Sequence, residues 1–172
     1  MLYHLQLIGY TIEVTSADQN FLLQKVQPAM VGLIDGSLST LAPIFGIAVY
    51  THRPHAALVA GLATAIGAAI SMAYSEGLSD TGELTGRGGP VLRGSITGGG
   101  TFLGGILHTL PFIIPNYHAA LVTAAIVVAF ELLALAIIRW KFFQTSFTRS
   151  LTHLVLGGAI IAIVGATLGA SA

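Results

Sequence analysis

The segment VQPAMVGLIDGSLSTLAPIFGIAVYTH, residues 26–52, decides the fold class, because it is apolar over the length of a membrane crossing and holds one acid. Asp35 is the only formal charge between Lys25 and Arg53. A charged side chain at the centre of a membrane helix costs about 2.5–3.5 kcal/mol on insertion scales. We therefore interpret Asp35 as functional, a titratable oxygen ligand inside a membrane. The alternative is a packing role, in which Asp35 bonds to a hydroxyl such as that of Ser39.

The composition of the whole chain agrees with this interpretation. Of the 172 residues, 54% are hydrophobic and 8% are charged, and the mean hydropathy is +0.83. A soluble domain carries about 25% charged residues. Backbone exposed to lipid must satisfy its own hydrogen bonds, so the composition predicts an all-α integral membrane protein.

Several functional classes are disfavoured by what the sequence lacks. The net charge is zero, which gives no basic surface for nucleic acid, and there is no cysteine to form a thiolate metal site. No GxxxxGK[ST] motif is present, so uphill transport by this chain alone would use an ion or proton gradient. No nucleophile–base pair or metal-hydrolase spacing is evident, and we expect neither an enzyme nor a resident cofactor.

Apolar runs of about 20 residues predict five transmembrane helices. Their ranges are 28–50, 56–76, 94–114, 118–138 and 152–170. Arg53 lies on one side of these spans, and the remaining basic residues lie on the other: Lys25, Arg87, Arg93, Arg139, Lys141 and Arg149. The positive-inside rule then predicts a cytosolic N-terminus and an external C-terminus. Residues 1–27 are predicted to form a short cytosolic or interfacial segment, and 28–172 a five-helix domain.

This orientation places Asp35, Glu76 and Glu131 in the inner half of the membrane. Met72, Glu76 and Asp80 recur at i, i+4 and i+8 and so share one helix face. Carboxylates with one thioether suit Fe²⁺, and oxygens alone suit Mn²⁺ or Mg²⁺. Because metal entry into buried carboxylates releases protons, such a site would support proton-coupled metal exchange.

Structural explanations compete with this hypothesis at several positions. Met72 is a common core residue type. Glu76 lies near the membrane interface, where a charged side chain costs little free energy. Glu131 would serve as a partner for Arg139 or a neighbouring helix. Interfacial placement is expected for most of the five histidines near predicted helix ends, which are His52, His55, His108, His118 and His153. GxxxG pairs are a weak dimer signal in a chain so rich in glycine.

A family resemblance makes the prediction more specific. GLIDGSLSTLAPIFGIA (32–48) and ISMAYSEGLSD (70–80) resemble the first two spans of the vacuolar iron transporter superfamily. The membrane domain of bacterial membrane-bound ferritins is a closer match, through SEGLSDTGELTGRGGPVLRG (75–94), HTLPFIIP (108–115) and VLGGA (155–159). The resemblance implies a homodimer in the bacterial inner membrane whose first spans line a pathway for Fe²⁺ leaving the cytosol against protons.

The resemblance also assigns roles to residues of this chain. It places Asp35 and Met72 in the ion pathway, with Glu76 beside them. The ferritin-like domain is not present in these residues, nor is the acidic helical insertion between the second and third spans of other members. Asp80 and Glu83 are the only acids of the connection at 77–93, so ion capture would rest on them or on a separate ferritin-like partner.

The prediction is therefore a secondary transporter that exports Fe²⁺ or Mn²⁺, with the metal ion as substrate, in exchange for protons. The alternative is a non-transporting membrane anchor or docking module for an iron-storage partner. The candidate metal-contacting residues are Asp35, Ser39, Met72, Glu76, Asp80, Glu83 and Glu131.

Overall fold

The computed structural model describes residues 3–7, 10–14 and 16–172. Within the predicted N-terminal segment 1–27, residues 1–2, 8–9 and 15 lie outside this description. The segment contains an antiparallel hairpin of two strands, β1 (Tyr3–Leu7) and β2 (Tyr10–Val14). The sequence analysis did not predict these strands.

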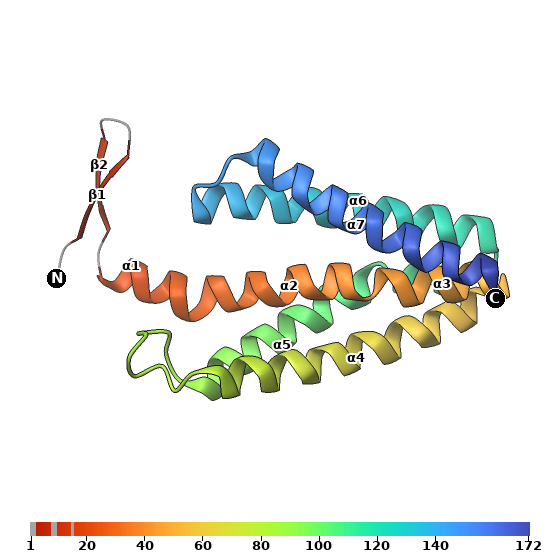
Figure 1. Ribbon diagram of the computed structural model, residues 1–172, viewed down its shortest axis with the longest axis horizontal. Coiled ribbons are helices and arrows are strands. Elements are labelled where there is room, and N and C mark those ends of the chain that lie inside the picture. The colour runs from red at the N-terminus through yellow and green to blue at the C-terminus, as the bar shows by residue number, and fades with distance from the viewer. Residues whose placement is uncertain (1–2, 8–9, 15) are drawn as a thin grey trace.

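Beyond the hairpin, every described element is helical (Figure 1). In chain order these are α1 (Ser16–Phe21), the π-helix η1 (Leu22–Val26), α2 (Gln27–Ser39), α3 (Leu41–Thr51), α4 (Pro54–Ser79), α5 (Pro90–Leu107), the 3₁₀-helix η2 (Leu110–Ile113), α6 (Tyr117–Phe143) and α7 (Phe147–Ser171).

Four helical stretches in the described residues are long and apolar enough to cross a membrane: Ala17–Thr51, Pro54–Ser79, Tyr117–Phe143 and Phe147–Ser171. They contain four of the five predicted spans. The first is longer than predicted because the helix begins well before residue 28.

The remaining predicted span, 94–114, differs in the structure. Its helix, α5, begins at Pro90 and ends at Leu107, after which the chain turns and forms η2. Pro111 has no backbone N–H to continue the helix. α5 is not among the four candidate spans, because it is rich in glycine and carries Arg93.

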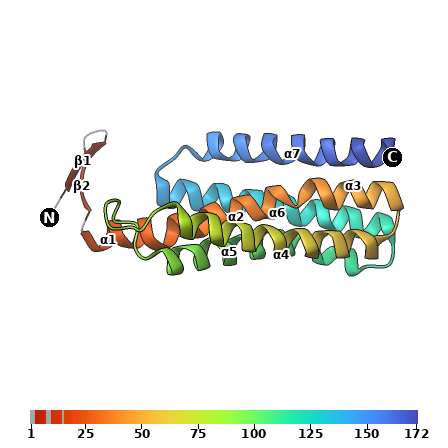
Figure 2. The same ribbon diagram turned by 60° about the horizontal axis from the view of Figure 1, so that its bottom comes forward.

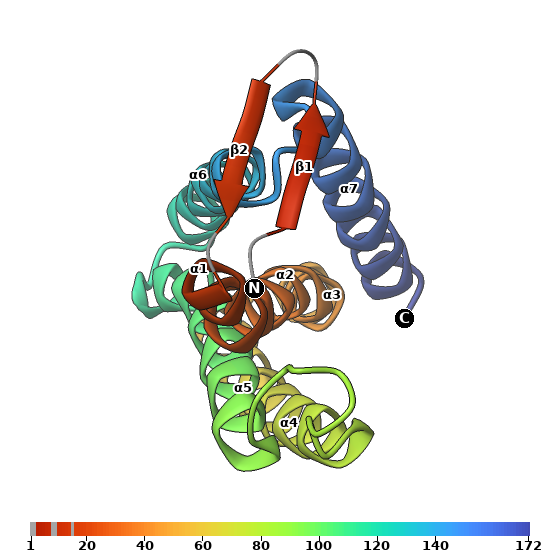
Figure 3. The ribbon, with the colours of Figure 1, turned by 90° about the vertical axis from the view of Figure 1, so that its left-hand side faces the viewer.

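The helices form a bundle around the long first helix. Seen from the end, α2 and α3 lie centrally, with α4 and α5 on one side and α6 and α7 on the other (Figure 3). Figure 2 shows α7 along one edge of the bundle. One end of the bundle holds the first residues of α2, α5 and α7 and the last residues of α4 and α6 (Figure 1).

We call this end the basic end, because six basic residues occur on the helix termini and the loop found there: Lys25, Arg87, Arg93, Arg139, Lys141 and Arg149. Arg53 lies between α3 and α4, at the opposite end. The structure therefore places these six basic residues at one end and Arg53 at the other, as the sequence predicted.

The closest helix contact joins α2 to α5. A Cβ atom on Gly32 or Gly36 would overlap the backbone carbonyl oxygen of Thr97 or Thr101, respectively. The hydroxyls of these two threonines donate to carbonyls four residues earlier, at 3.0 Å each, so both hydroxyls are paired within α5. Here the GxxxG spacing serves contacts within one chain.

The first membrane helix is interrupted at Thr40, which separates α2 from α3. Pro43 contributes to the interruption, since it lacks the N–H that would bond to the carbonyl of Ser39. The two halves have different neighbours: α2 packs mainly on α5, and α3 packs mainly on α7. The α3–α7 contact is also a close backbone approach, in which Gly165 lies against Ala42.

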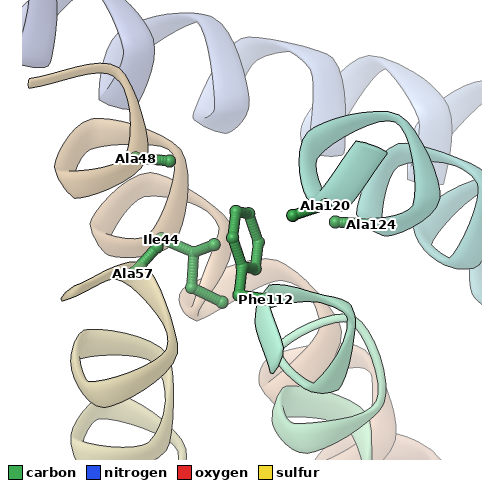
Figure 4. Packing of buried hydrophobic residues seen from close by; sticks show 6 residues of the cluster. All are labelled: Ile44, Ala48, Ala57, Phe112, Ala120 and Ala124. Carbon is green, nitrogen blue, oxygen red and sulfur yellow. The ribbon is translucent and has the colours of Figure 1, made fainter. Parts of the chain in front are cut away.

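Two apolar clusters fill the bundle. In one, the ring of Phe112 lies between Ile44 of α3 and the alanines Ala120 and Ala124 of α6 (Figure 4). The other joins α2, α6 and α7 through Met30, Leu132, Leu135, Ala136 and Leu154. Many large apolar side chains on the outer faces of α4, α6 and α7 are exposed, as expected of helices that face lipid.

Candidate functional site

Asp35 lies in α2, about one helical turn before the interruption at Thr40, and it is half-buried. In the part of the chain that the structure describes, its carboxylate has no hydrogen bond or ion pair. Ser39 is one turn further along the same face, and its Oγ atom is buried and has no hydrogen-bond partner within residues 3–7, 10–14 and 16–172. The packing interpretation, in which Asp35 bonds to the Ser39 hydroxyl, is therefore not what the structure shows.

The face that carries Asp35 continues as a groove toward the other end of the bundle. Ala42 and Gly46 follow Asp35 at i+7 and i+11 and so lie on its side of the helix. Both line a groove of about 410 Å³ between α3 and α7. The groove is mostly apolar, and Tyr50 and Leu168 are among its lining residues.

Met72 is half-buried in α4, one turn before Glu76. It follows Gly61 by eleven residues, which places the two on the same side of the helix. Gly61 packs against the side chain of Ile44 in α3. Met72 therefore lies on the side of α4 that faces the first membrane helix.

Glu76 is held by two arginines at the basic end. Its Oε1 atom lies 2.6 Å from Nη2 of Arg87 and 2.7 Å from Nε of Arg93. The side chain of Arg93 is 1% exposed and also donates to the backbone carbonyls of Gly88, Glu76 and Asp80. In this state Glu76 is a charge-compensated part of the α4–α5 junction, and it would bind a metal ion only after exchanging an arginine.

The remaining acids of the α4–α5 connection differ from one another. The Thr85 hydroxyl and the Gly82 N–H both donate to the Asp80 carboxylate, and these bonds, the Thr85 bond first, hold the pKa of Asp80 below its usual range. Asp80 therefore organises its own loop. Glu83 is exposed on the same loop.

Glu131 is buried in α6, and its partner is a histidine, not Arg139. Its Oε2 atom lies 2.9 Å from Nδ1 of His108. The Nε2 atom of His108 lies 2.7 Å from the hydroxyl of Thr40. His108 is fully buried, so the expectation that it is interfacial is wrong. Arg139 instead approaches the hydroxyl of Ser150.

The structure thus separates the candidate residues. Asp35 and Ser39 share one face of the first helix, and Met72 lies on α4. Glu76 and Asp80 meet the two arginines at the basic end, where Glu83 is exposed on the same loop, and Glu131 lies inside the bundle. Among the described residues, no group of three or more His, Asp or Glu side chains is placed to hold a metal ion. A sequence pattern could have suggested His108, because an intramembrane acid needs a partner and His108 lies in the apolar segment HTLPFIIP.

Comparisons with known proteins add one positive finding. A search of curated proteins found no match to the chain, and a search of solved structures also found none. The match to a family model covers α2, α3, α4 and most of the α4–α5 loop, and it therefore includes Asp35, Met72 and Glu76. Residues 26–85 match the model of the VIT family, which supports a relationship of this chain to the vacuolar iron transporter superfamily.

Proposed function

We propose that this protein is a multi-pass membrane transporter that moves Fe²⁺ or Mn²⁺ out of a bacterial cytosol in exchange for protons. The four apolar helices and the family match support a metal ion transporter. The proposal depends most on one observation, the half-buried carboxylate of Asp35 inside the matched segment, without a hydrogen bond or ion pair in the described part of the chain.

In this proposal Asp35 contacts the ion in transit, and Met72 supplies a thioether from α4. A carboxylate and a thioether together suit a borderline ion such as Fe²⁺. Asp80 and Glu83 attract the cation at the basic end, which faces the cytosol. Glu131 is not a ligand in this scheme, because its Oε2 atom is already engaged by His108.

We further propose that α5 is a fifth crossing and that the C-terminus is external. α5 lies between α2 and α4 and buries eight of its residues. A helix covered by its neighbours in this way does not need the apolar surface that lipid demands. Two copies of the chain would place their Asp35 faces and the α3–α7 grooves toward a shared pathway.

The test is metal flux in proteoliposomes that carry a pH-sensitive dye inside, with Fe²⁺, Mn²⁺, Co²⁺ and Zn²⁺ compared. We expect flux of the first two ions with opposite proton movement, and loss of flux in Asp35→Asn with the fold retained. Glu83→Gln is the matched control, since it removes an exposed acid outside the pathway, and it should lower the apparent affinity without abolishing flux. Full flux in Asp35→Asn would overturn the proposal, and no flux in the wild type would favour a membrane anchor.

A further inference from the structure

Three polar side chains from distant parts of the sequence meet inside the bundle. His108 follows the last residue of α5, Glu131 comes from the middle of α6, and Thr40 lies at the interruption between α2 and α3. His108 and Thr40 are fully buried, and the side chain of Glu131 is 9% exposed. The proposed metal pathway uses none of the three.

The hydrogen bonds define where protons lie in this group. The Thr40 hydroxyl is 2.8 Å from the carbonyl oxygen of Gly36, which can only accept, so the hydroxyl donates to it. The Nε2 atom of His108 must then carry the hydrogen of its own bond to Thr40. On the other side of the ring, one proton must lie between Nδ1 and the Glu131 Oε2 atom, because two lone pairs would repel at 2.9 Å.

We propose that His108 and Glu131 form an intramembrane proton-binding site whose occupancy is transmitted to the helix interruption through Thr40. The structure represents the loaded state, in which the pair holds one proton in addition to the hydrogen on Nε2. The second oxygen of Glu131, Oε1, is buried and has no hydrogen-bond partner among the described residues. An ionised carboxylate accepts through both oxygens, so this arrangement favours a carboxyl group that shares a proton.

Loss of the proton has a defined structural consequence. The ring retains one hydrogen, and only on Nδ1 can that hydrogen preserve the bond to the anionic Glu131. Nε2 then becomes an acceptor, and the Thr40 hydroxyl must turn from the Gly36 carbonyl to the ring. Proton release therefore removes a hydrogen bond from the backbone of α2 at the point where the first membrane helix is interrupted.

Other ionisable groups on the surrounding elements are engaged elsewhere or distant. Asp35 of α2 lies on a different helix face from Thr40, Arg93 of α5 and Glu76 of α4 pair at the basic end, and Arg139 of α6 approaches Ser150. On α7, His153 is exposed. On α3 the only ionisable side chain is Tyr50, which is exposed, and η2 carries none. Among the described residues, no other ionisable side chain forms a hydrogen bond or ion pair with His108 or Glu131.

The site is tested directly by ¹⁵N NMR of the full chain in lipid nanodiscs. The sequence has six histidines, and changing the other five to glutamine leaves His108 as the only signal without altering the site. From about pH 5 to about pH 9, where such groups titrate, we expect one transition. At low pH Nε2 is protonated and Nδ1 shares a proton with Glu131, and at high pH the neutral ring is protonated on Nδ1 alone. A high-pH form protonated on Nε2, or no transition, would overturn the proposal.

A variant pair separates the proton site from general charge effects. Glu131→Gln removes the carboxyl group that shares the proton with Nδ1, so the midpoint of the His108 transition should move to lower pH by at least about one unit, a tenfold change in proton affinity. Glu83→Gln removes an exposed acid and should leave the midpoint unchanged. Equal shifts in both variants would contradict a specific pair. The wild-type titration stands as a test even if Glu131→Gln does not fold.

If the His108–Glu131 pair carries the protons that exchange for metal during export, the inference rests on the proposed function. Measurements in proteoliposomes distinguish the transport proposal from the proton-site proposal. Glu131→Gln should retain metal flux while moving fewer protons per metal ion than the wild type. If the His108 transition is present but the wild type carries no metal, the transport proposal fails and the proton site stands. If metal exchanges for protons while His108 does not titrate, the proton site fails alone.

Discussion

Replacement of Arg93 by methionine should be among the most destabilising changes at the basic end. The side chain is 1% exposed and satisfies the carbonyls of Gly88, Glu76 and Asp80 in addition to its ion pair with Glu76. Methionine fills similar volume but leaves three partly buried carbonyls without their donor. Removing one partner of a buried ion pair costs about 3–5 kcal/mol, and we expect a loss in this range.

Arg87→Met is the matched control, because Arg87 contacts the same oxygen of Glu76 but is 25% exposed. An exposed ion pair contributes about 0–1 kcal/mol, so this variant should lose far less stability. The assay is equilibrium unfolding in mixed detergent micelles, followed by circular dichroism. Equal losses in the two variants would refute the reasoning, since they would show that the carbonyl bonds of Arg93 contribute nothing.

Three further outcomes follow from local contacts. Gly36→Ala should lower the free energy of unfolding by about 1–3 kcal/mol, because the added methyl group overpacks against α5. Gly99→Ala, where nothing lies within 4 Å, should instead raise it by about 0.5–1 kcal/mol. Equal effects of the two changes in thermal unfolding would contradict the close approach of α2 and α5. Because the pKa of Asp80 is lowered in the folded protein, its stabilisation of the loop should be complete above about pH 4 and decline as pH falls through the lowered pKa. Amide exchange at Gly82, corrected for its intrinsic rate, should accelerate there, and a constant corrected rate would oppose this. Asn116→Ala should lower the free energy of unfolding by about 0.5–2 kcal/mol, because the Asn116 side chain accepts a hydrogen bond from the backbone N–H of Ala119 at 2.9 Å. Thermal unfolding measures this loss, and Asn116→Asp, which keeps an acceptor, should be nearly neutral.

Much of the membrane architecture could be predicted from the sequence because its signals are local. Hydropathy and length located the four long apolar helices, and the positions of arginine and lysine located the basic end. α5 was predicted less well. Its end at Leu107 depends on the turn that inserts His108 into the bundle, and apolar runs do not report such turns.

The polar contacts could not be predicted, because they join residues that only the tertiary fold brings together. Glu76 looked like a free ligand, and its two arginines arrive from the loop and from the first turn of α5. Glu131 was expected to bind Arg139 or a neighbouring helix, and its partner is His108 at the end of α5, 23 residues earlier in the chain, so the sequence did not identify which residue it would be. Helical spacing identifies which acids share a face, but it does not identify the cations that neutralise them.

The interruption at Thr40 divides one membrane crossing between two sets of neighbours, since α2 is fixed to α5 and α3 to α7. A rigid continuous helix would force these two contacts to move together. With the joint at Thr40, a rotation of α3 and α7 against α2 and α5 bends the chain one turn from Asp35 while the glycine contacts on each side remain intact. The carboxylate would then face a different opening while the α2–α5 and α3–α7 contacts are kept, and the contact between α3 and α4 would have to adjust.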